Sequence, residues 1–131
     1  MEGMRFMIQI DYQDKRPIYE QVVEKIRNLI VLGLLPADEK LQSVRSLAID
    51  LSINPNTIQK AYQELERQGF IYTVKGRGNF VAAQEMWKND LSKEALEKLH
   101  EILIELKNLG VSVSHIMTEV SNVMGGVKEY D

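Results

Sequence analysis

Two predicted helices that follow each other across a very short connection constrain this chain more than any other feature. Ser43 is a favourable N-cap, and an apolar stripe at helical spacing follows it as far as Ser52. After only Ser52 and Ile53, Asn54 offers a second N-cap, and Pro55 stands at the first helical position, which its fixed φ suits. Two helices joined so closely must turn sharply, so the sequence predicts a helix-turn-helix.

The segments on either side complete a small, mainly α-helical domain with a β-hairpin. Pro17 and Gly33 are typical of the two ends of a first amphipathic helix. The expected elements around the turn are helix 17–32, helix 55–69, strand 70–74, glycine-rich turn 75–78 and strand 79–82. This order predicts a winged helix-turn-helix over residues 1–82. A weak alternation at residues 6–10 is consistent with a further short strand.

Residues 83–131 are predicted to form two amphipathic helices that separate at Gly110. Their apolar stripes are too wide for two helices to cover by packing on each other. Most soluble oligomers are two-fold dimers, so we expect a helical dimerisation tail and a homodimer. The residues expected to pair the two copies are Leu91, Ala95, Leu99, Ile102, Leu106, Leu109, Ile116 and Val120.

The net charge of −3 argues mildly against a nucleic-acid partner, because DNA attracts basic proteins. The acidic excess, however, is confined to the tail. Residues 1–82 carry eleven Lys or Arg against ten Asp or Glu (net +1), and residues 83–131 carry five against nine (net −4). A DNA-binding domain so close to neutrality must concentrate its positive charge at the contact points.

Several classes of protein are disfavoured by composition. The absence of cysteine excludes disulfides and thiolate metal sites. Even the apolar run 29–32 is far shorter than a membrane span, and the N-terminus lacks the apolar core of a signal peptide, so we expect a cytoplasmic protein without a membrane partner. His100 and His115 lack carboxylates at ligand spacing. We therefore expect no metal, no cofactor and no catalytic residue, and no enzyme.

Candidate DNA-contacting side chains gather at two places. At the start of the third helix, amides and hydroxyls can bond base edges or phosphates, and Asn or Gln can pair bidentately with adenine. On the hairpin turn, glycines allow the backbone to approach closely, and a basic residue can reach phosphates or the minor groove. The candidates are Asn56, Thr57, Gln59 and Lys60 on the helix and Lys75 and Arg77 on the turn. Polar residues face water on any helix, so a protein-interaction module stays open.

Three stretches together resemble the GntR family of bacterial regulators: residues 41–48 (LQSVRSLA), 53–66 (INPNTIQKAYQELE) and 76–81 (GRGNFV). Residues 17–21 (PIYEQ) and 54–57 (NPNT) resemble its YtrA branch, whose members carry a two-helix dimerisation tail. The resemblance implies a sequence-specific transcriptional regulator of double-stranded DNA, a repressor on a pseudo-palindromic operator. It also suggests transporter operons as targets and leaves the small-molecule effector unknown.

The resemblance also implies roles for single residues. Arg45 matches the arginine at the start of the second helix that contacts DNA, and Arg77 with Gly78 matches the tip of the wing. Asn56, Thr57 and Gln59 match the positions that contact bases and phosphates. The sequence departs from the usual residues at Ala37 (glycine), Gln42 (proline), Pro55 (arginine in other branches) and Asn79 (threonine). We expect the first two departures to loosen the linker before the second helix. A metal-sensing protein or enzyme that uses His100 and His115 is the remaining alternative.

Overall fold

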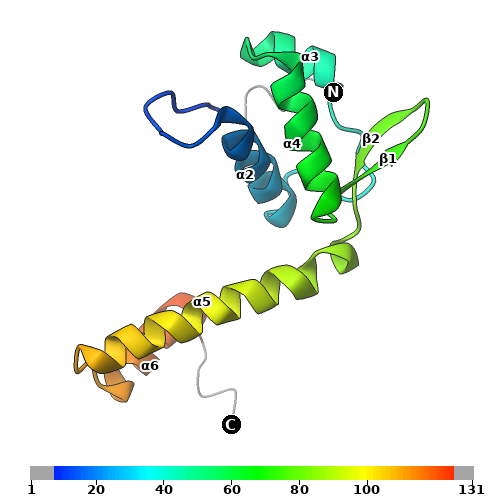
Figure 1. Cartoon of the computed structure of the whole chain (residues 1–131). Coiled ribbons are helices and arrows are strands. Elements are labelled where there is room, and N and C mark those ends of the chain that lie inside the picture. Colours follow the sequence, from blue (N-terminus) through cyan, green and yellow to red (C-terminus); the bar gives the residue numbers. More distant parts are fainter. Residues whose placement is uncertain (1–7, 126–131) are drawn as a thin grey trace. The chain divides into compact units, whose positions relative to one another are not determined.

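The computed structural model describes residues 8–125, and the chain divides into two compact units, Met1–Asn89 and Asp90–Asp131 (Figure 1). The elements of the first unit are α2 (Ile18–Val31), α3 (Val44–Leu51), α4 (Pro55–Arg67), β1 (Ile71–Val74), β2 (Gly78–Val81) and the 3-10 turn η1 (Gln84–Met86). After it come α5 (Lys88–Asn108), which begins at the boundary, and α6 (Val113–Met124). This is the predicted mainly helical, winged helix-turn-helix architecture.

The sharp turn between α3 and α4 is built from local caps. The Ser43 side chain accepts a hydrogen bond from the Ser46 N–H, at 3.1 Å, and the Asn54 side chain accepts one from the Asn56 N–H, at 2.8 Å. Ser52 ends α3 in the left-handed conformation, with φ of 56°. These caps satisfy backbone groups that each helix end would otherwise leave without a partner, so both helix boundaries lie where the sequence predicts them.

One face of α4 forms the centre of the first unit. In Figure 1, α4 lies beside α2, with α3 at its N-terminal end and β1 after its C-terminal end. The fully buried large side chains are Val22, Ile26, Leu35, Leu47, Ile58, Tyr62, Leu65 and Val81, together with Gln21. Burial of each aliphatic side chain contributes about 1.5–3 kcal/mol to the stability of the fold. Because this packing fixes one face of α4, its opposite face is held toward solvent.

The hairpin has an antiparallel register in which Ile71 pairs with Val81 and Val74 with Gly78. The expected turn 75–78 is therefore one residue too long, because Gly78 belongs to β2. The Arg77 N–H closes the turn on the Val74 carbonyl oxygen at 2.9 Å. The linker before α3 adds to this sheet, because Lys40 forms an antiparallel bridge with Phe80.

The expected strand at residues 6–10 does not form over Ile8–Ile10, and residues 6 and 7 lie outside the described part of the chain. Ile8 is buried. The side chain of the buried Gln21 accepts from the Asp11 N–H at 2.9 Å and donates to the Asp11 carbonyl oxygen at 3.0 Å. A side chain thus takes the place of a neighbouring strand in pairing this segment.

The second unit has no buried residue in α5 or in α6. The two helices are separated at Gly110, whose φ is +81°, and Ser112 caps α6 by accepting from the His115 N–H at 3.1 Å. The apolar stripes stay exposed or half-exposed in the single chain. Within residues 8–125, none of the helices combines the length and the apolar character that crossing a bilayer requires.

Candidate nucleic-acid interface

The first turns of α4 present a polar face to solvent. Asn56, Gln59 and Gln63 are exposed at positions i, i+3 and i+7, which places them on one stripe of the helix, and Thr57 is half-buried beside them. The buried Ile58 lies on the opposite side. The first turn lies at the positive end of the helix dipole, which favours anions such as phosphate, although its N–H groups are already bonded to Asn54. The face therefore offers amides for base edges next to a site that attracts phosphate.

Lys60 makes a contact that sequence reasoning did not foresee. Its ammonium lies 3.9 Å from the centre of the Tyr19 ring on α2. Such a cation–π contact contributes about 0.5–1 kcal/mol at an exposed site. Lys60 would have to give up this contact in order to reach a phosphate. The contact was not predicted because Tyr19 and Lys60 lie far apart in the sequence and no local pattern connects them.

Arg45 is exposed in the first turn of α3, and a buried glutamine fixes the segment before it. Gln42 donates from its side chain to Ser46 Oγ at 2.9 Å and to the Asp50 carboxylate. The buried Tyr62 hydroxyl donates to the Gln42 carbonyl oxygen at 2.6 Å, and its burial raises the pKa of Tyr62 well above the usual value. The expectation that Gln42 loosens the linker is wrong, because its hydrogen bonds tie the linker to α3 and α4.

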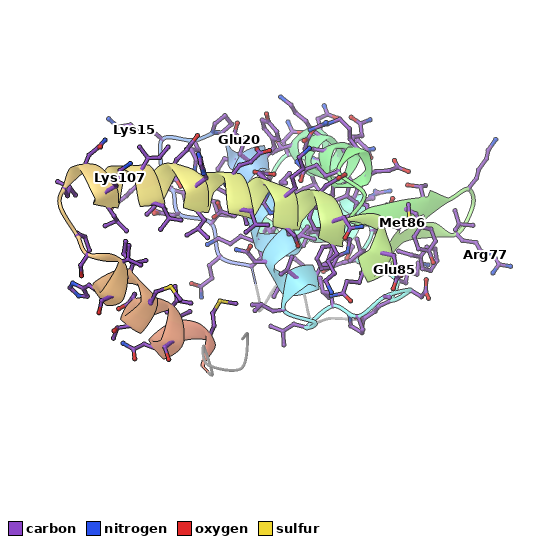
Figure 2. All side chains as sticks on the ribbon, turned by 90° about the horizontal axis from the view of Figure 1, so that it is seen from below. Lys15, Glu20, Arg77, Glu85, Met86 and Lys107 are labelled. Carbon is purple, nitrogen blue, oxygen red and sulfur yellow. The ribbon has the colours of Figure 1, made fainter. Side chains whose placement is uncertain are left out.

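The hairpin tip carries two exposed basic side chains, Lys75 and Arg77. Figure 2 shows Arg77 at the tip, with its side chain pointing away from the strands. Among the described residues, neither of them forms an ion pair. The stacked rings of Tyr72 and Phe80, 5.6 Å apart, join the two strands below the tip. The tip is thus a basic projection on a stiffened base.

Gly78 follows Arg77 and has a φ of +124°, which L side chains rarely adopt. A Cβ placed at Gly78 would lie 3.1 Å from Cε of Lys40, which reaches across from the linker. Lys40 was not among the residues selected from the sequence. Its position depends on the bridge between the linker and β2, which leaves no local pattern.

The second unit contains an apolar groove of about 590 Å³ between α5 and α6. Its lining residues are Leu99, Ile102, Leu103, Leu106, Val111, His115, Ile116, Met117, Glu119, Val120, Val123 and Met124. The groove brings together five of the eight residues expected at the dimer interface. Leu91, Ala95 and Leu109 lie outside its lining. No cluster of three or more potential metal-ligating side chains occurs in the described residues, and this includes the surroundings of His100.

Comparison with known proteins identifies the family. The model of the bacterial regulatory proteins of the gntR family matches residues 18–81, which span α2 to the end of β2. The transcriptional repressor YtrA of Bacillus subtilis is 36% identical over 126 residues, which cover 93% of this chain and 95% of the relative. The chain belongs to the GntR family. The full-length match also confirms the YtrA branch that residues 17–21 and 54–57 indicated.

Solved structures of GntR-type regulators have the same fold. A transcriptional regulator from Oenococcus oeni has a TM-score of 0.74 and 37% identity, over 88% of this chain and 98% of the other. The DNA-binding domain of AraR in complex with operator ORX1 has a TM-score of 0.53 and 32% identity, over 57% of this chain and 96% of the other. The GntR chain is thus a DNA-binding regulator of transcription, and its family and relatives are not enzymes.

Proposed function

We propose that this GntR regulator binds a pseudo-palindromic operator as a homodimer and represses transcription from it in the cytoplasm. The observation that carries the proposal is the solvent-facing polar stripe at the N-terminus of α4, in the same compact unit as the exposed Arg45 and the basic wing tip. An exposed helix start of this kind fits the major groove, whose width admits one α-helix.

Base and backbone contacts divide between the elements of the first unit. Asn56 and Gln59 read base edges, since their amides both donate and accept, and Thr57 bonds a base or a phosphate. The remaining expected contacts go to the DNA backbone, through Arg45, Lys60, Lys75 and Arg77. Gly78 places the wing backbone next to the DNA, directly after Arg77.

The tail joins two chains, so that each chain can bind one half-site of the operator. Its groove exposes apolar side chains that a single chain leaves in water, and a two-fold partner would cover the same patch on both copies. Such a dimer would present two α4 helices to major grooves about 34 Å, or a multiple of that, apart. Linking two half-site readers raises affinity by roughly 10²–10⁴-fold without any new contact.

Repression is supported by the full-length relative, which is named a transcriptional repressor. Operator binding is supported by the AraR domain, which was solved with operator ORX1. A dimer that occupies an operator keeps other proteins from that DNA, so binding alone is enough to repress when the operator overlaps a promoter.

Selection of bound sequences from a random DNA pool tests the proposal with the full chain. We expect the selected sequences to share an inverted repeat, since two copies related by a two-fold axis read opposite strands. Transcription in vitro from a template that carries this repeat at its promoter should fall when the protein is added. A single, non-repeated motif would contradict the homodimer, and the absence of any enriched motif would contradict sequence-specific binding.

A further inference from the structure

Lys40 is held in the sheet that forms the wing. The Leu41 N–H donates to the Asn79 carbonyl oxygen at 2.8 Å, and the Val81 N–H donates to the Glu39 carbonyl oxygen at 3.0 Å. These bonds set Lys40 opposite Phe80. The linker next to α3 is therefore part of the same sheet as the wing.

The Lys40 side chain lies on the sheet face that looks away from the protein core. Residues opposite each other in an antiparallel pair point to the same face, as do residues two apart on one strand. Lys40 thus shares its face with Phe80 and Gly78, while Leu41 and Val81, on the other face, are buried. Lys40 is an exposed residue, and none of the ion pairs found between described residues involves it.

The missing side chain at Gly78 leaves the space that Lys40 occupies. A Cβ at that position would lie 3.1 Å from Lys40 Cε and 3.9 Å from Nζ, and the first distance is too short for an ordinary contact. The ammonium is therefore carried along β2 toward Arg77, the next residue toward the tip. The Lys40 ammonium, beside Lys75 and Arg77 at the tip, extends the positive charge of the wing along one edge.

We propose that Lys40 binds a phosphate of the DNA backbone next to the wing, and that Gly78 is needed partly because it lets Lys40 lie across it. The proposal rests on the operator binding proposed above. An ammonium is a compact point charge with three donors, which suits a phosphate oxygen and carries no base preference. Lys40 therefore adds affinity and salt dependence but no sequence specificity.

The salt dependence of binding tests the role of Lys40. The full-length protein and its Lys40→Gln variant would be titrated against the selected operator in gel-shift experiments at several salt concentrations. Each phosphate neutralised contributes a slope of about 0.9 to log K against log [salt], so the loss of one contact per protomer should make the dimer's slope shallower by about 1.8. The sequences selected from a random pool should not change.

The matched control is Lys93→Gln, which removes the same charge from an exposed position on α5. This variant should keep the wild-type slope. A Lys40→Gln slope equal to that of the wild type would overturn the role of Lys40, while the proposed function would stand. Failure of the wild-type protein itself to bind DNA would contradict the proposed function instead.

A double-mutant cycle tests the link between Lys40 and Gly78. Gly78→Ala strains the backbone in any background, but it displaces the lysine only where the lysine is present. The fold-loss in operator affinity caused by Gly78→Ala should therefore be smaller in a Lys40→Ala background than in the wild type. Equal losses in the two backgrounds would show that Gly78 does not position Lys40. The Lys40→Gln slope is measured independently of whether Gly78→Ala folds.

Discussion

In the homodimer proposed above, replacing Ile102 with aspartate should separate the two copies and remove most of the operator affinity. Ile102 lines the tail groove and is 51% exposed in the single chain, so about half of its burial is left for a partner to provide. Full burial of such a side chain is worth about 1.5–3 kcal/mol, so the half that a partner provides contributes about 1 kcal/mol per copy to the free energy of dimerisation. The two copies together contribute about 2 kcal/mol. Burying two carboxylates without partners adds at least about 2 kcal/mol. The total of about 4 kcal/mol corresponds to a roughly 10³-fold weaker dimer.

Ile104→Asp provides the matched control. Ile104 belongs to the same helix and is 48% exposed, but it lies two residues along, on the other side of α5, and does not line the groove. Light scattering should find Ile102→Asp monomeric at a concentration where the Ile104→Asp variant and the wild type are dimeric. Gel shift on the same samples should show an affinity loss only for Ile102→Asp. Equal behaviour of the two variants would refute the assignment of the groove as the dimer interface.

Three further outcomes follow from the first unit. Tyr62→Phe leaves the Gln42 carbonyl oxygen without its donor and should lower the free energy of unfolding in urea by about 1–3 kcal/mol; an unchanged value would contradict the role of this bond. Arg77→Ala should weaken gel-shift binding to all sequences alike, and a changed base preference would mean that the wing tip reads bases. Arg67 lowers the pKa of Glu64 to about 2, so this pair stabilises the fold above the unfolded pKa of about 4.5 and the benefit is lost as pH falls toward 2. Because Arg67 is largely exposed, the loss should stay below about 1 kcal/mol, and it should be absent in Glu64→Gln when unfolding is measured at pH 5 and pH 3.

Local signals were enough to predict most of the fold. Ser43 and Asn54 cap their helices through side chains two or three residues from the N–H groups they satisfy, so a short window of sequence fixes both helix starts. The wing was predicted because β-forming runs flank a turn with Gly76, although one turn residue belongs to β2. The apolar stripes of α5 and α6 were predicted from helical spacing alone.

The contacts that escaped prediction join residues far apart in the chain. Lys40 reaches Gly78, Tyr19 lies under Lys60, and Trp87 stacks on Phe70 with ring centres 5.3 Å apart. The first two depend on how the linker and α2 pack against the wing and α4. The third lies within the first compact unit, which runs to Asn89. Local pattern reports propensity and burial, but it does not report which distant side chains meet.

The effect of Gln42 on the linker also could not be predicted from local sequence. A proline there would stiffen the linker by fixing φ, and a glutamine suggests a looser chain. Its side chain instead bonds Ser46 and Asp50, while its carbonyl accepts from Tyr62. Hydrogen bonds thus replace a covalent restraint, and only the structure shows the partners.

The base preference of Gln59→Ala tests the central claim most directly, namely that the exposed start of α4 reads the operator. Sequences selected by this variant should lose discrimination at one base pair of each half-site by about 1–3 kcal/mol, or roughly 5- to 150-fold. Gln84→Ala, at an exposed glutamine in η1, should select the same sequences as the wild type. If Gln59→Ala also selects the wild-type sequences with undiminished preference, α4 does not read the operator through this side chain and the account of the recognition helix is contradicted.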